Sequence, residues 1–294
     1  MARARRSVHF VPGGQSRMFE RALSSPADSL VLDLEDSVTP ERKAAARGEV
    51  RDWLAGADFG GRERVVRINP SDGELWEEDL EVTMSAPPDA YMLPKVGGVA
   101  DLVRVDERLS ALEARAGVEP GRIGVIPIAT ETAEGLLRVS ETARGPRVVA
   151  LTWGAEDLSA DLGASASRDA DGRYLEVFRY ARVMTLLASK AAGVQAIDGV
   201  YTDFRDTDGL RAEAGEAARM GFDGKLTIHP AQLESVNAAF SPSDEEVRES
   251  RELLAAFEKN RRAGRMAFSH KGRMVDVPHL NRALAILERA QRSG

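Results

Sequence analysis

The chain has 294 residues, of which 43% are hydrophobic and 30% are charged. This composition suits one large barrel or two modest domains and excludes intrinsic disorder for most of the chain. The sequence contains no cysteine, which excludes thiolate nucleophiles, cysteine-ligated metal centres and disulfides. The lack of cysteine is compatible with a reducing compartment, and we expect a cytoplasmic protein. No apolar run approaches the roughly 20 residues that cross a bilayer, so we expect a soluble protein without a membrane partner.

Charge is distributed unevenly along the chain. The formal net charge is −7, but residues 241–294 hold 11 Lys and Arg against 8 Asp and Glu, which leaves −10 for residues 1–240. An acidic body argues against general nucleic-acid binding, whereas basic ends suit a phosphorylated small ligand. The same arginines also fit a simply solvated surface, and the charge pattern by itself leaves both interpretations open.

Strand-like runs alternate with helical patterns up to about residue 240. Eight short apolar runs are each followed by a break rich in Gly, Pro or Ser. They are Val8–Val11, Leu30–Leu34, Arg64–Ile68, Tyr91–Leu93, Ile123–Ile128, Val148–Thr152, Ala196–Tyr201 and Lys225–Ile228. The helices between them include Glu41–Leu54, which follows a Thr-Pro start, and Arg173–Ala192. Eight strand–helix units predict a closed (β/α)8 TIM barrel over residues 1–240.

The alternation stops beyond Phe240. The stretch Ser243–Glu246 has the pattern of a capping box and predicts a helix that runs to about Arg262. After a basic turn that contains glycine, leucines spaced by four and three residues predict a last helix. We therefore expect residues 241–294 to form a C-terminal helical extension or lid, packed on its own barrel or on a neighbour's.

Polar residues follow nearly every predicted strand. Because the carboxyl ends of barrel strands meet at one mouth, these side chains are expected to converge on a common site. The set comprises Asp33, Glu35, Asp36, Arg67, Asn69, Lys95, Glu131, Glu156, Asp157, Asp198, Asp203 and His229. Taken singly, each also fits a helix start, a loop acid or a counter-ion. Their convergence favours a functional site.

The residue types at this mouth favour a hard divalent cation. Carboxylates in a chain with no cysteine and four histidines suit Mg²⁺ or Mn²⁺, which needs only one or two protein carboxylates. Glu131 and Asp157 follow neighbouring strands, so we predict that they bind one ion. Arg67 has the fixed charge and planar donors that suit a carboxylate or a developing enolate.

Several short motifs also occur in a fixed order. They are Val11–Gly13, Leu32–Ser37, Arg67–Asn69, Leu93–Val96, Gly154–Leu158, Asp198–Tyr201, Gly221–Lys225 and Ile228–Pro230. From about residue 7 to residue 288 this pattern resembles the HpcH/HpaI aldolase and citrate lyase beta-subunit family. The resemblance implies a TIM barrel of the phosphoenolpyruvate-binding type, a divalent metal, and carbon–carbon bond cleavage or formation beside a carboxylate or CoA thioester. It also implies a homo-oligomer, a trimer or a hexamer.

The resemblance further implies roles for individual residues. Glu131 and Asp157 look like the magnesium ligands, with Glu131 also at the substrate, and Arg67 looks like the arginine that binds substrate and enolate. The stretch Lys271–Asp276 resembles the C-terminal motif of malyl-CoA and citramalyl-CoA lyases, in which the aspartate acts as acid and base. Asp276 also fits a plain N-cap of the last helix, and as a catalytic residue it is expected to act in a neighbouring subunit's site.

The resulting hypothesis is a Mg²⁺-dependent lyase that converts a malyl-CoA-like or citramalyl-CoA-like 3-hydroxyacyl-CoA into acetyl-CoA and a 2-oxo acid, or runs the reverse condensation. Arg17 is the basic residue expected to bind the CoA phosphates. Two alternatives stay open. One is a citryl-CoA lyase or an aldolase that acts on a free hydroxy acid, and the other is a non-catalytic subunit that binds CoA or an oxo acid.

Overall fold

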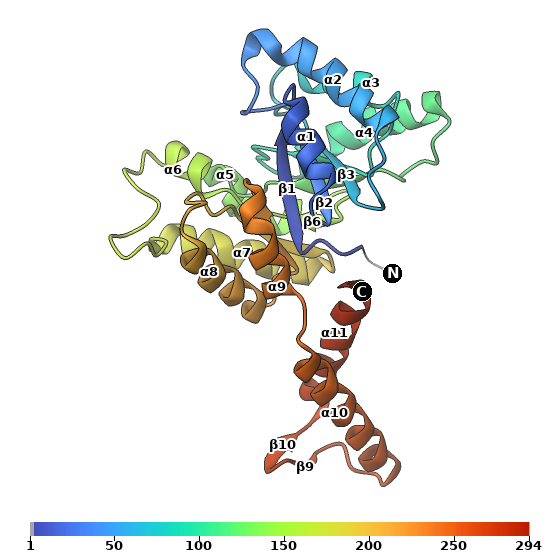
Figure 1. Cartoon of the computed structure of the whole chain (residues 1–294), viewed down its shortest axis with the longest axis vertical. Helices are drawn as coiled ribbons and strands as arrows, with labels where there is room; N and C mark the ends of the chain where they lie inside the picture. The colour runs from blue at the N-terminus through green and yellow to red at the C-terminus, as the bar shows by residue number, and fades with distance from the viewer. Residues whose placement is uncertain (1–2, 294) are drawn as a thin grey trace. The chain divides into compact units, whose positions relative to one another are not determined.

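A computed structural model of the chain describes residues 3–293 (Figure 1). The chain separates into two compact units: the larger is Arg5–Val236, and the C-terminal part of the smaller begins at Asn237. The domain boundary expected between residues 240 and 241 stays a prediction. Within the described residues, no helix has both the length and the apolar character needed to cross a membrane.

Eight parallel strands form the sheet of the larger unit. They are β1 (Ser7–Pro12), β2 (Ser29–Asp33), β3 (Glu63–Arg67), β4 (Ala90–Leu93), β5 (Gly124–Pro127), β6 (Ala150–Leu151), β7 (Gln195–Asp198) and β8 (Gly224–Thr227). Neighbouring strands follow the order β5-β4-β3-β2-β1-β8-β7-β6. Single parallel bridges, Val125 to Val148 and Ile128 to Thr152, join the two ends of this series. The eight predicted strands and the TIM-barrel fold are confirmed.

Helices surround these strands (Figure 1). They are α1 (Ser16–Leu23), α2 (Lys43–Gly56), α3 (Trp76–Thr83), α4 (Val99–Ala116), α5 (Ala133–Thr142), α6 (Ala155–Asp161), α7 (Glu176–Ala192), α8 (Thr207–Met220) and α9 (Leu233–Phe240). Helix α2 starts later than predicted because Pro40–Arg42 forms a separate 3-10 turn. Helix α7 also starts late, because Tyr174 is still held in an extended bridge with Arg168.

Strand side chains alternate between the barrel interior and the helices. Val31, Val65 and Leu226 belong to the apolar cluster inside the barrel. Leu30 and Leu32, on either side of Val31, belong to the cluster beneath the helices. Because both faces are buried, each strand reads in the sequence as a short continuous apolar run.

The C-terminal unit is a helical hairpin. Helices α10 (Asp244–Arg262) and α11 (Val277–Ser293) lie side by side, with β9 (Phe268–His270) and β10 (Arg273–Val275) at one end (Figure 1). The predicted capping box at Ser243 is confirmed. The antiparallel pair of β9 and β10 was not expected. Its two-residue turn places Lys271 and Gly272 at positive φ, which matches the right-handed twist of a hairpin.

A buried ionic cluster ties the end of the barrel to its helices. Asp198 of β7 and Lys225 of β8 are both fully buried, with 2.9 Å between Oδ2 and Nζ. Arg182 of α7 donates to both oxygens of Asp198 at 2.9 and 3.0 Å. Glu213 of α8 lies 2.9 Å from Lys225. Ile197 of β7 and Leu226 of β8 face the barrel interior. Because side chains alternate along a strand, the adjacent Asp198 and Lys225 lie on the opposite face, and this cluster is on the helix side of the sheet.

Replacing Asp198 by Asn is expected to lower the free energy of unfolding by about 3–5 kcal/mol at pH 7, because Lys225 and Arg182 lose a buried counter-charge. Burial by itself would raise the pKa of Asp198, but Lys225 and Arg182 overcome it and lower the pKa to about 2 from 3.8. The carboxylate therefore stabilises the fold above about pH 4, and this contribution is lost as the pH falls through about 2. Denaturant titrations at pH 7, 4 and 2.5 measure the difference in the free energy of unfolding between wild type and variant, and we expect this difference to become smaller below pH 4. A difference that stays constant over this range would contradict the lowered pKa of Asp198.

Candidate active site

A cavity of about 300 Å³ opens at the carboxyl ends of the barrel strands. Its apolar lining includes Phe10, Ile128, Trp153, Val200, Leu226 and Ile228, and its charged lining is Asp33, Arg67, Glu131, Glu156 and Asp157. The structure therefore brings together five residues of the set predicted at the mouth, and these include Arg67, Glu131 and Asp157, the predicted metal and substrate residues. A cavity at this end of a parallel barrel is the usual place of an active site.

The Glu131 carboxyl is buried at the wall of this cavity, with 3% of the residue exposed. Its Oε2 accepts a hydrogen bond from the backbone N of Lys95 at 2.6 Å. Gly154 lies directly against it, since a Cβ at that position would come within 2.8 Å of Glu131 Cγ. Burial, followed by the charge of Asp157, raises the pKa of Glu131 to about 8. The site thus holds a carboxyl whose ionisation is poorly compensated by the protein.

Asp157 lies in the first turn of α6, and its side chain is 34% exposed. Its Oδ1 is 3.3 Å from Nζ of Lys95, which also pairs with Glu35 and Asp36. The described residues contain no group of three or more metal-binding side chains. A pair of carboxylates nevertheless fits Mg²⁺ or Mn²⁺, because these ions keep several water or substrate ligands. A divalent cation between Glu131 and Asp157 would also offset the repulsion that raises the pKa of Glu131.

Arg67 is held rigidly at the end of β3. Its Nε and Nη2 each donate to one oxygen of Asp33 at 2.7 Å, and Nη1 lies 2.7 Å from Glu35 Oε2. The ring centroid of Phe10 is 4.8 Å from the guanidinium carbon. With 12% of its side chain exposed, Arg67 presents a fixed positive charge to the cavity.

Other residues expected at the mouth have different places. The expectation for Asp198 is wrong, because its side chain is fully buried on the helix side of β7. His229 caps the short helix Pro230–Gln232 and stacks on Phe204 at 4.7 Å. Asn69 is buried, and both its backbone N and its side-chain amide donate to Asp79. The position at the end of a strand therefore does not by itself place a side chain in the cavity.

Sequence reasoning missed the apolar residues of the cavity wall, among them Phe10 and Trp153. Phe10 could have been found from the alternation of β1, since it shares a strand face with Val8, which lies in the barrel interior. Trp153 directly precedes Gly154–Asp157, which the sequence analysis already predicts to form part of the site. This position beside a predicted site was the signal that could have identified Trp153. Both are apolar, so a search for charged strand ends passes over them.

Two further predicted residues lie elsewhere in the chain. Arg17 is exposed on α1. Asp276 directly precedes α11, where its carbonyl accepts hydrogen bonds from the backbone of His279 and Leu280. Its carboxylate Oδ1 lies 2.6 Å from Nδ1 of His279. The helix-start position of Asp276 is thus observed, while the catalytic role of Asp276 and the CoA contact of Arg17 stay predictions.

Comparison with known proteins decides the family. The sequence pattern of the HpcH/HpaI aldolase/citrate lyase family matches residues 6–230. The chain belongs to this family. It is 38% identical to a (3S)-malyl-CoA thioesterase of Cereibacter sphaeroides, over 97% of this chain and 94% of that protein. It is 39% identical to the mitochondrial citramalyl-CoA lyase of Rattus norvegicus, over 96% of this chain and 85% of that protein.

A solved family structure resembles the whole chain. The CitE protein of Mycobacterium tuberculosis, in complex with magnesium, acetoacetate and coenzyme A, has a TM-score of 0.79 and 37% identity, covering 97% of both chains. These findings confirm the family resemblance read from the sequence. They also confirm that magnesium and coenzyme A are ligands within this family of lyases.

Replacing Glu131 by Gln is expected to change how the stability of the metal-free protein depends on pH. Because the pKa of Glu131 is raised to about 8, the folded protein keeps a proton that the unfolded chain loses near pH 4.5. Wild-type stability should therefore fall between about pH 5 and 8 relative to the variant, which has no proton to lose there. We expect the variant to melt about 3 °C or more above wild type at pH 8.5. Parallel melting-temperature profiles from pH 5 to 8.5 would contradict this.

Proposed function

We propose that the protein is a Mg²⁺-dependent lyase that cleaves a 3-hydroxyacyl-CoA of the malyl-CoA or citramalyl-CoA type into acetyl-CoA and a 2-oxo acid, or that runs the reverse condensation. The observation that carries the proposal is the carboxylate pair of Glu131 and Asp157 in one cavity with the fixed charge of Arg67. Two carboxylates suit the cation, and the guanidinium suits an enolate oxygen.

The groups at the site have separate roles in this reaction. Glu131 and Asp157 would hold the cation, which supplies Lewis-acid stabilisation of charge on the oxygens of the 2-oxo acid. Asp276, proposed below as acid and base, would accept the hydroxyl proton as the carbon–carbon bond breaks. The electron pair of that bond moves to the thioester to form the enolate, whose oxygen Arg67 would bind, and the same carboxyl then returns a proton to the enolate carbon to give the acetyl methyl group. Asp33 and Glu35 hold the guanidinium before substrate arrives, so little reorganisation is needed.

The apolar side of the cavity supports the same chemistry. Ile128, Val200 and Leu226 line the space beside the charged residues. Such a wall limits the access of water to a carbanion-like enolate and strengthens the attraction between Arg67 and the enolate oxygen.

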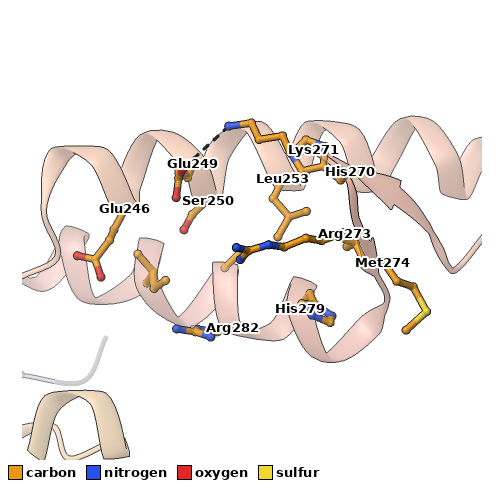
Figure 2. A pocket seen from close by; sticks show the side chains of 13 residues that line it. Glu246, Glu249, Ser250, Leu253, His270, Lys271, Arg273, Met274, His279 and Arg282 are labelled. Atoms are coloured by element: carbon orange, nitrogen blue, oxygen red, sulfur yellow. Dashed lines mark ion pairs between the residues drawn. The ribbon is translucent and has the colours of Figure 1, made fainter. Parts of the chain in front are cut away.

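For proton transfer to the acetyl methyl group, we propose Asp276 of a neighbouring subunit in a trimer or hexamer. Asp276 follows β10, and its side chain is 36% exposed. In its own unit, a cavity of about 590 Å³ is lined by Lys271, Arg273 and Arg282 among others (Figure 2). These cations suit the phosphates of CoA, as does the exposed Arg17, which we propose as a further phosphate contact.

A second candidate function is hydrolysis of the thioester. It is favoured by the relative that is named a (3S)-malyl-CoA thioesterase, which is 38% identical over nearly the full length. Lyase and thioesterase differ in their products, because only the lyase releases a 2-oxo acid. The remaining alternatives are a citryl-CoA lyase or an aldolase that acts on a free hydroxy acid, and a non-catalytic subunit that binds CoA or an oxo acid. Absence of turnover with malyl-CoA and citramalyl-CoA would favour these alternatives.

The assay follows CoA, acetyl-CoA and 2-oxo acid released from malyl-CoA and citramalyl-CoA, with Mg²⁺ and with EDTA. We expect equal amounts of acetyl-CoA and 2-oxo acid, dependent on Mg²⁺. Asp157→Ala should lower kcat/KM by about 10³-fold or more while the melting temperature changes little, because the side chain is partly exposed. Free CoA with malate would instead indicate hydrolysis, and turnover in EDTA would contradict the metal role.

The subunit origin of Asp276 is tested by mixing two inactive variants. Arg67→Ala and Asp276→Asn should each be nearly inactive as homo-oligomers. Oligomers reassembled from both should regain activity, because some sites then combine an intact Arg67 with an intact Asp276 from the neighbouring chain. Mass spectrometry of the intact assemblies controls for mixing. Mixed assemblies that stay inactive would place Asp276 in its own subunit's site or outside catalysis.

A further inference from the structure

One hydrogen bond joins the buried ionic cluster to the wall of the candidate active site. Nε1 of Trp153 donates to Oδ1 of Asp198 at 2.9 Å. Asp198 is fully buried on the helix side of the barrel, whereas Trp153 lines the cavity although only 1% of it is exposed. The side chain of Trp153 packs with Leu158 and Phe178 beneath the helices, so this residue connects the charged cluster on the helix side of the sheet with the site at the barrel mouth.

The Trp153 indole is confined on several sides. A Cβ on Gly199 would lie 3.0 Å from its Cε2 and 3.1 Å from its Nε1, so the backbone there fits closely against the ring. The Tyr174 ring packs edge-on, with 5.0 Å between centroids. These contacts hold the indole in the orientation in which its N–H donates to Asp198.

The contacts continue from Tyr174 back to Asp198. The guanidinium of Arg168 lies 3.6 Å from the centroid of the Tyr174 ring and pairs with Glu213 at 2.8 Å. Glu213 in turn pairs with Lys225, the partner of Asp198. The indole is thus one member of a closed circuit of hydrogen-bonded, ionic and aromatic contacts that includes β7, β8 and α8.

Trp153 is followed directly by the segment that the proposed metal site depends on. The backbone of Gly154 abuts the Glu131 side chain, since a Cβ there would lie 2.8 Å from Glu131 Cγ. Helix α6 then begins at Ala155 and carries Asp157 in its first turn. A shift of the Trp153 backbone would therefore change the separation of the Glu131 and Asp157 carboxylates.

We infer that Asp198 is a positioning residue: through the Trp153 indole it fixes the Gly154–Asp157 segment and hence the spacing of the two carboxylates. The part of this inference that concerns metal rests on the proposed function. Asp198 itself does not line the cavity, and the hydrogen bond from Trp153 is a direct side-chain contact between it and a residue that does. Groups of this kind, which orient the ligands of a metal, commonly change metal affinity by about tenfold or more when removed.

The test compares Trp153→Phe with Trp76→Phe. The first change removes the N–H that binds Asp198 and keeps an aromatic ring. The second is the matched control, because Trp76 is also a buried indole, 7% exposed, in the cluster beneath α2 to α4. Two properties are measured in the resting protein: hydrogen exchange of the backbone amides of residues 154–161, and the Kd for Mn²⁺ by electron paramagnetic resonance.

We expect Trp153→Phe to speed exchange in residues 154–161 by about tenfold and to weaken Mn²⁺ binding by about tenfold. Trp76→Phe should leave the exchange rates of residues 154–161 and the Kd for Mn²⁺ at the wild-type values, even if it lowers the melting temperature as much as Trp153→Phe does. Wild-type exchange and wild-type Mn²⁺ affinity in a folded Trp153→Phe protein would overturn the inference.

Gly199→Ala serves as a second variant in case Trp153→Phe does not fold. It adds a methyl group against the indole and leaves the side chains of Asp198 and Trp153 in the chain, and the same local changes are expected. If the wild-type protein binds no Mn²⁺, the proposed metal site fails, while the exchange rates still decide whether Trp153 and Asp198 hold this segment.

Discussion

The burial of the Glu131 carboxyl beside Asp157 is the constraint on which the rest of this site depends. A carboxylate removed from water and placed near another carboxylate resists ionisation, and the pKa of Glu131 rises to about 8 as a result. The fold tolerates this because one backbone N–H of Lys95 binds the carboxyl and the Lys95 side chain pairs with Asp157. A divalent cation would remove the remaining cost, so the same imbalance that weakens the metal-free protein favours metal binding.

The geometry of the barrel places the Glu131 and Asp157 carboxyls together with too little positive charge to compensate them. Strands β3, β5 and β6 end at the same mouth, so that Arg67, Glu131 and Asp157 meet although they lie far apart in the sequence. The charge of Arg67 is already engaged by Asp33 and Glu35, and it therefore orients a ligand more than it neutralises the acidic pair. Positive charge, acidic pair and apolar wall then share one small cavity, as an enolate-forming reaction requires.

Much of this arrangement could be predicted from the sequence. Strands buried on both faces read as apolar runs, and the rule that strand ends converge placed Arg67, Glu131 and Asp157 together. The rule failed for Asp198 because it does not state which face of the strand a residue occupies, and here Ile197 takes the interior position. The hairpin of β9 and β10 was missed because it is short and largely exposed, so it lacks an apolar signal.

The central claim, that Glu131 and Asp157 together bind one divalent cation, is tested most directly by anomalous diffraction from crystals grown with Mn²⁺. The account predicts one strong anomalous peak at the mouth of the barrel, about 2.0–2.3 Å from a carboxylate oxygen of each residue. It also predicts that the peak disappears in crystals of Glu131→Gln grown at the same Mn²⁺ concentration. A peak that contacts neither carboxylate, or one that persists unchanged in the variant, would contradict the claim.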